Sequence, residues 1–245
     1  DFDLRLTAFN GGSLDNAIPR EATADLMLPP DQEMEFAQMI EHFAKTTATG
    51  YAAKEPGFRL KLSKDVEFSS VVESGLQNAI ITAIANCPDG VVAMSENIPG
   101  FVQTSSNLGV VRTEEDLIRI TSLQRSADDA ERDRLVTTLS HFFTKAGAAV
   151  EYKSSYPGWT PQPESPVLEK FIEVYREYSG VEPEVRAIHA GLECGIFKGI
   201  NPHLDMISFG PDITGAHSPD ERVRIESVAK FHNLLLALLA RIAEK

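Results

Sequence analysis

Short apolar and polar alternations, separated by amphipathic stretches, fill the first third of the chain. Alternation predicts strands, while apolar residues at helical spacing predict helices. The strands are expected at residues 2–9, 22–28 and 58–62. The helices are expected at residues 31–46 and 70–85, the first after the Pro29-Pro30 pair that ends a strand. The predicted order is strand, strand, helix, strand, helix.

The same reading extends to about residue 155. Strands are predicted at residues 109–112, 117–123 and 148–152, and a helix at residues 129–146. The connections between neighbouring strands are short, which favours antiparallel pairing. The pattern therefore predicts an α+β layer, an antiparallel sheet with helices on one face, over residues 1–155.

A change in composition follows this block. Three prolines fall within the stretch 156–163, which predicts a stiff connection and a domain boundary. After it, Ser165-Pro166 opens a helix that Gly180 ends, since a hydroxyl cap before a first-turn proline favours a helix start. Two short strands and a long last helix complete the segment, at residues 185–189, 206–209 and 221–243. We expect residues 156–245 to form a separate α/β segment.

Charge and composition exclude several classes of protein. The formal net charge is -13, the wrong sign for binding nucleic acid through its phosphates or an anionic membrane surface. No stretch approaches the ~20 apolar residues of a membrane span. Two cysteines far apart, Cys87 and Cys194, form no disulfide framework, which favours a reducing compartment. We expect a soluble, cytoplasmic protein, and since the chain opens without Met directly in a strand, a piece of something longer.

Two segments near the C-terminus, each following a predicted strand, contain candidate functional residues. His217 lies between a strand and the last helix, where an imidazole can face a ligand crevice, or it can merely bond a local carbonyl. The stretch 189–195 contains Gly191, Glu193 and Cys194, and its glycines either allow close backbone approach to a ligand or form a tight turn. Cys194 has no neighbouring cation to stabilise a thiolate, so a nucleophilic role is not expected.

Elsewhere single residues offer weaker candidates. Asn16 could bond a substrate or only shape its turn, and Arg125 could pair with a carboxylate or remain an ordinary surface arginine. His203-Leu204-Asp205 has the spacing of a metal-binding pair, but it would start the buried strand predicted at residues 206–209 and has no acidic cluster beside it in sequence, so we read it as structural.

Together these stretches resemble one family. Their amino-acid sequences are similar to those of the aminoacyl-histidine (Xaa-His) dipeptidases, which are cocatalytic-zinc peptidases related to carboxypeptidase G and aminoacylase. The similar stretches are residues 11–21, 104–109, 122–126, 189–195 and 210–221. The resemblance implies a zinc-binding catalytic domain interrupted by a lid, with substrate closed between them. Residues 1–155 would be most of the lid, without its first strand and helix, and 156–245 the C-terminal part of the catalytic domain.

The resemblance also implies residue roles. His217 would be a zinc ligand, Asn16 and Arg125 would reach the substrate carbonyl and carboxylate, and Gly191 and Glu193 would contact the substrate. In the complete enzyme, one or two zinc ions would activate a water that attacks the peptide bond. One histidine cannot hold zinc, because catalytic sites use three or more protein ligands. No catalytic residue is therefore expected in this segment, which would be inactive alone.

Three hypotheses remain open. The first is part of a zinc dipeptidase that acts on short peptides and forms a homodimer through the lid. The second is a non-catalytic dimerisation or regulatory module with the lid fold. The third is a related zinc tripeptide aminopeptidase or amidase.

Overall fold

A computed structural model describes residues 2–244 except 65–69, 154–156, 160, 161, 163, 189–192, 217 and 219. Its contacts divide the chain into two compact units that interleave in sequence. The first unit contains Asp1–Cys87, Asn107–Leu123 and Ser140–Val150, and the second contains Pro88–Ser106, Gln124–Leu139 and Glu151–Lys245. The division predicted at residue 155 stays a prediction.

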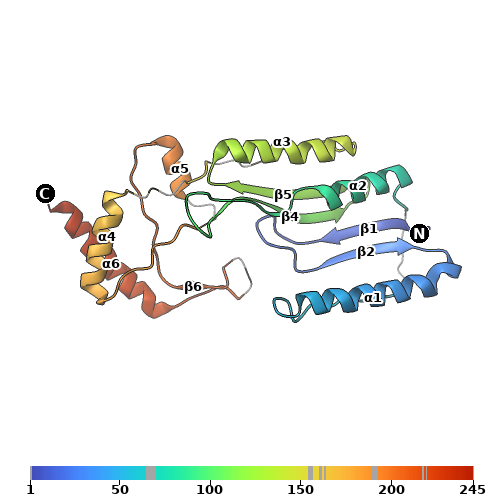
Figure 1. Ribbon diagram of the computed structural model, residues 1–245, viewed down its shortest axis with the longest axis horizontal. Coiled ribbons are helices and arrows are strands. Elements are labelled where there is room, and N and C mark those ends of the chain that lie inside the picture. Colours follow the sequence, from blue (N-terminus) through green and yellow to red (C-terminus); the bar gives the residue numbers. More distant parts are fainter. Residues whose placement is uncertain are drawn as a thin grey trace. The chain divides into compact units, whose positions relative to one another are not determined.

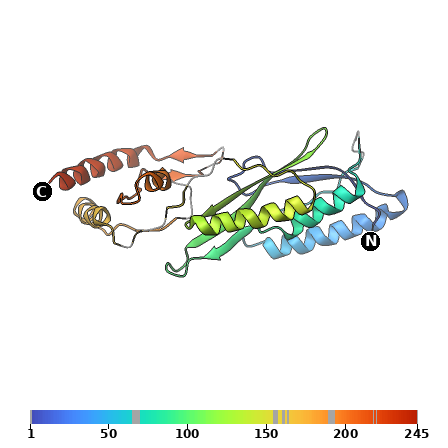
Figure 2. The same cartoon turned by 90° about the horizontal axis from the view of Figure 1, so that it is seen from above.

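The first unit is built on an antiparallel strand pair. Strands β1 (Arg5–Gly11) and β2 (Ala22–Met27) pair in the register Leu6↔Leu26, with an irregularity between Leu6 and Ala8. Helices α1 (Glu33–Tyr51), preceded by the 3₁₀ turn η1 (Pro30–Gln32), and α2 (Ser74–Asn86) lie on the same face of this pair (Figure 2). The strand pair and the two helices each contribute apolar residues that are less than a tenth exposed. These residues are Leu6 on β1, Phe36 on α1, and Ile80 and Ala83 on α2.

A longer strand continues the sheet. Strand β4 (Val102–Thr113) pairs with β1 at Gly11↔Val111 and, nearer its start, antiparallel with β3 (Gly90–Met94). Strand β5 (Ile118–Ser126) also pairs with β4, so the sheet has the order β2-β1-β4-β3 with β5 beside β4 (Figure 1). Helix α3 (Asp129–Lys145) follows β5 and buries Leu135 and Leu139.

The C-terminal part of the second unit is mainly helical. Helix α4 (Pro166–Ser179) packs on α6 (Ile225–Ala243), with a core of Phe171, Val174, Leu234 and Leu238. Ser165 caps the start of α4, and Gly180, at φ 74°, ends it. Helix α5 (Glu193–Ile200) and the short antiparallel pair β6 (Ile213–Thr214) and β7 (Arg222–Val223) lie between these helices in sequence.

The observed architecture is a mixed α/β fold with an antiparallel sheet and, in the described part of the chain, six α-helices. All five predicted helices are present. The strand predictions at residues 58–62, 148–152, 185–188 and 206–209 are wrong, because these residues are irregular in the structure. The apolar side chain of Phe209 is instead used in the α4–α6 core, where the centre of its ring lies 4.7 Å from that of Phe171.

Four elements were not predicted: strands β3, β6 and β7 and helix α5. Helix α5 contains two glycines within eight residues, which lowers its helix propensity. No helix within the described ranges has both the length and the hydropathy that crossing a membrane requires.

Candidate functional site

Asn16 is exposed in the loop that joins β1 to β2, within the first unit. The loop closes where the Gly12 amide donates to the Glu21 carbonyl at 3.1 Å. Gly12 has φ 67°, a conformation that glycine adopts without steric cost. The loop is also bonded to β4, because the Arg112 guanidinium donates to the Gly12 carbonyl at 2.7 Å.

Arg125 occupies the next-to-last position of β5, within the second unit. The side chain is half-buried, and its Nε is fully buried with no hydrogen-bond partner among the described residues. Leaving a buried donor unpaired costs about 1–3 kcal/mol, and the cost is larger when the group is charged. An unpaired guanidinium nitrogen therefore needs an explanation. A carboxylate ligand would provide one, since guanidinium and carboxylate match in charge and in planar geometry.

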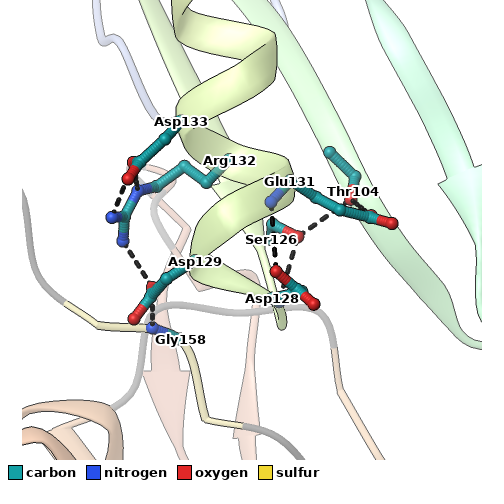
Figure 3. Close-up of polar contacts among 8 residues, drawn as sticks. All are labelled: Thr104, Ser126, Asp128, Asp129, Glu131, Arg132, Asp133 and Gly158. Atoms are coloured by element: carbon teal, nitrogen blue, oxygen red, sulfur yellow. Dashed lines mark hydrogen bonds and ion pairs between the residues drawn. The ribbon is translucent and has the colours of Figure 1, made fainter.

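The end of β5 is held by a chain of hydroxyl and carboxylate contacts (Figure 3). The buried hydroxyls of Thr104 and Ser126 lie 2.8 Å apart, and Thr104 donates to Glu131 Oε2 at 2.7 Å. Gln103 donates to the same oxygen at 2.8 Å. These two bonds, from Gln103 and then Thr104, hold the pKa of Glu131 below its ordinary value of 4.5. A charged Glu131 on α3 therefore holds the start of β4 directly, and the end of β5 through Thr104.

The donor and acceptor in each of these hydrogen bonds follow from counting hydrogens. An ionised Glu131 only accepts, so the one hydroxyl hydrogen of Thr104 goes to it. Ser126 must then donate to Thr104, while its oxygen accepts from the amide of Asp128 at 3.1 Å. Asp128 itself caps α3 by accepting from the Glu131 amide at 3.1 Å. The residue after Arg125 is thus bonded through both its hydrogen and its oxygen.

The segment Pro157–Gly158 connects the start of α3 to α5. The Gly158 amide donates to Asp129 Oδ1 at 3.0 Å, as Figure 3 shows. A Cβ on Gly158 would lie 2.4 Å from the Ser126 carbonyl oxygen, and a Cβ on Gly195 would lie 2.3 Å from the Pro157 oxygen. Only glycine permits these approaches, so the end of β5, this segment and α5 are in direct contact.

The predicted site residues are therefore distributed as follows. Arg125 and the exposed Glu193, the first residue of α5, belong to the second unit on elements joined through Pro157–Gly158. Asn16 belongs to the first unit. Gly191 and His217 lie outside the described residues.

The described residues do not form a metal centre. No group of three or more His, Cys, Asp or Glu side chains in this part of the chain is arranged to hold a metal ion. Asp205 is a helix cap instead, because its carboxylate accepts from the Ser165 hydroxyl at 2.6 Å and the Val167 amide at 2.9 Å. Burial, aided by Glu193, raises the pKa of Cys194, which keeps its thiol neutral.

Sequence reasoning missed a pocket of about 430 Å³ beside β3. Its polar lining includes Glu96, Asn97, Gln103, Asp128 and Glu131. Three of these residues, Gln103, Asp128 and Glu131, already form the hydrogen bonds described above at the end of β5. The pocket therefore adds no separate chemistry. It could not be found from the sequence because it depends on the unpredicted strand β3.

Comparisons with known proteins give consistent matches. The sequence matches peptidase family M20/M25/M40 over residues 21–241. It is 39% identical over all 245 residues to the cytosol non-specific dipeptidase of Escherichia coli (strain K12), of which it covers 50%. It also matches the crystal structure of aminoacylhistidine dipeptidase from Vibrio alginolyticus with a TM-score of 0.81 and 39% identity, covering 100% of this chain and 50% of that one.

A more distant structure shares only the fold. Aminopeptidase PepT from Bacillus cereus ATCC 10987 matches with a TM-score of 0.51 and 20% identity, over 69% of this chain and 45% of that chain. The chain spans about half the length of the curated relative and solved structures that it matches.

Proposed function

Because this chain belongs to peptidase family M20/M25/M40, we propose that it is part of a zinc-dependent dipeptidase that hydrolyses Xaa-His dipeptides. In this proposal residues 1–155 form most of a lid, and residues 156–245 form the C-terminal part of the catalytic domain. Support comes from the two dipeptidase relatives, each 39% identical over the whole chain. The aminopeptidase structure does not support the tripeptide aminopeptidase hypothesis, because that likeness is 20% identical and shows the fold alone.

The observation that carries the substrate assignment is the unpaired Arg125 Nε. A free C-terminal carboxylate distinguishes a dipeptide from an internal stretch of a protein, and a guanidinium is the side chain best matched to it. The fixed end of β5 supports this role, since a binding group whose neighbours are locked loses less entropy when the ligand binds.

The other proposed contacts rest on position. Asn16 donates to the substrate carbonyl and steadies the negative charge that develops on its oxygen, a role worth about 3 kcal/mol in comparable sites. Gly191 offers a backbone contact beside the scissile bond, and Glu193 contacts the substrate from the start of α5. Asn16 is supported by its exposure, and Glu193 by the contact between α5 and the segment that reaches β5.

The proposed zinc does not fit the described residues of this chain, which offer no set of ligands. His217 is the one ligand proposed from this chain, on its resemblance to the family motif. The remaining ligands would belong to the part of the relatives that this chain does not span.

Two further properties complete the proposal. A cytoplasmic location is supported by the name of the Escherichia coli relative. A homodimer through the lid is supported by β2, which ends the sheet order and leaves Leu26 and Met27 39% and 36% exposed. Edge strands of this kind pair readily with a second chain, and light scattering on the complete enzyme would reveal a monomer if the proposal is wrong.

The decisive experiment compares two substrates that differ only at the carboxylate. The complete enzyme carrying this chain is assayed with an Xaa-His dipeptide and with its C-terminal amide. A charge-assisted hydrogen bond is worth about 1.5–3 kcal/mol, so kcat/KM should favour the free acid by about 10- to 150-fold. Arg125→Gln should abolish this preference by lowering kcat/KM for the acid alone.

The matched control is Arg134→Gln, which removes an arginine of the same unit whose side chain is 70% exposed. This variant should keep the preference for the free acid. Equal kcat/KM for acid and amide in the unaltered enzyme would refute the role of Arg125. No hydrolysis of any Xaa-His dipeptide would refute the substrate class.

A further inference from the structure

The amide of Asn107, on β4, bonds the β1–β2 loop on both sides of Asn16. Its Nδ2 donates to the Asp15 carbonyl at 2.7 Å and to the Ala17 carbonyl at 2.9 Å. Ninety or more residues of sequence separate the partners in each bond. One side-chain nitrogen thus fixes the carbonyls immediately before and after Asn16.

The packing around this contact leaves the loop little freedom. A Cβ on Gly109 would lie 2.7 Å from both the Cα and the carbonyl oxygen of Asp15, and a Cβ on Gly12 would lie 1.9 Å from the Gly109 oxygen. Residues 107 and 109 share a face of the strand, because side chains alternate along β4. That face of β4 therefore carries the loop directly, with backbone against backbone.

The chemistry of the contact requires a primary amide. An NH₂ group has two hydrogens at a fixed angle, one for each carbonyl. A serine hydroxyl has one hydrogen and can serve only one carbonyl, and an aspartate would set its negative charge against both oxygens. Asparagine is also depleted in strands, so its presence within β4 is not explained by strand propensity.

We propose that Asn107 is a positioning residue, which holds the two peptide carbonyls flanking Asn16 and thereby sets where Asn16 meets the substrate. The inference rests on the proposed function of Asn16 for its catalytic consequence. Its structural part, the ordering of residues 12–21 by one side chain, is independent of that function.

The structural part is tested by hydrogen exchange on the chain. Asn107→Asp should make the amides of residues 12–21 exchange faster by about tenfold, the change that ~1.4 kcal/mol of lost bonding produces. Asn107→Ser should give an intermediate increase, which guards against a general loss of folding in the aspartate variant. The matched control is Asn86→Asp, which removes an amide that donates to the Thr82 carbonyl at 2.8 Å in α2. Unchanged exchange of the loop in Asn107→Asp would overturn the inference.

The catalytic part is tested by a double-mutant cycle in the complete enzyme. A displacement of ~1 Å can cost about 100-fold, so Asn107→Asp should lower kcat by about 10- to 100-fold and leave KM unchanged. If Asn107 acts through Asn16, the double variant with Asn16→Ala should be no slower than Asn16→Ala alone.

The outcomes separate the two claims. Losses that multiply in the double variant, or a rise in KM alone, would overturn the positioning role. Full activity of Asn16→Ala would instead refute the proposed function of Asn16, and the exchange result would still decide whether Asn107 orders the loop.

Discussion

Replacing Thr104 by valine should destabilise the second unit without changing the volume of its side chain. Thr104 is 2% exposed, and its hydroxyl both accepts from Ser126 and donates to the carboxylate of Glu131. Valine preserves the branched shape and removes both bonds. Ser126, 9% exposed, then keeps a hydroxyl hydrogen with no acceptor in the chain of contacts described above.

The expected loss follows from these two bonds. A hydrogen bond to a charged group is worth about 1.5–3 kcal/mol and a neutral one about 0.5–1.5 kcal/mol. Glu131 keeps its bond from Gln103, and its side chain is 29% exposed and can regain water. The lower half of the summed range applies, so the free energy of unfolding should fall by about 2–3 kcal/mol.

Acid should diminish this difference. The folded state lowers the pKa of Glu131, so the carboxylate contributes stability that is present above its unfolded pKa and lost as pH falls through the folded pKa. The gap between the unaltered chain and Thr104→Val should be largest near pH ~7 and smaller near pH ~3.

The assay is urea unfolding followed by the fluorescence of Trp159, the single tryptophan, which adjoins Gly158 in the second unit. The control is Thr137→Val, which removes an exposed hydroxyl that donates to the Asp133 carbonyl of the same helix and should cost less than about 0.5 kcal/mol. Equal losses in the two variants, or a Thr104→Val loss that acid leaves unchanged, would refute the reasoning.

Two further predictions concern metal. Asp205→Ala should cost about 1–2 kcal/mol of stability by uncapping α4 and should leave the zinc content of the complete enzyme unchanged, as measured by elemental analysis; a loss of zinc would make Asp205 a ligand after all. The 245-residue chain alone, supplied with zinc, should not hydrolyse Xaa-His dipeptides, because its described residues offer no metal cage, and turnover in that assay would contradict this.

Hydrogen bonds to residues distant in sequence decided what the polar candidates do. The spacing of His203 and Asp205 suggested a metal pair, and the sequence favoured instead the start of a buried strand. That strand is not formed, and the Asp205 carboxylate accepts hydrogen bonds from Ser165 and Val167. Arg125 was nominated by its place at the end of a strand, but only the fold leaves its Nε buried and unpaired. Asn107 belongs to residues 104–109, one of the stretches that resemble the dipeptidase family, but the sequence assigned it no role. The signal that could have identified it is an asparagine within a strand.

The sequence by itself determined five of the six described α-helices, the antiparallel character of the sheet and the family. A helix satisfies its backbone within four residues and shows its buried face every three or four, so Ser165 and Gly180 marked the ends of α4 correctly. The extent of β4 was decided by tertiary structure, because its stretch Ser105-Ser106-Asn107 becomes a strand through pairing with β3 and β5. The segments at residues 58–62 and 148–152 alternate equally well and do not form strands. Strand and loop contacts join residues far apart in the chain, and local periodicity carries no information about which of them will meet.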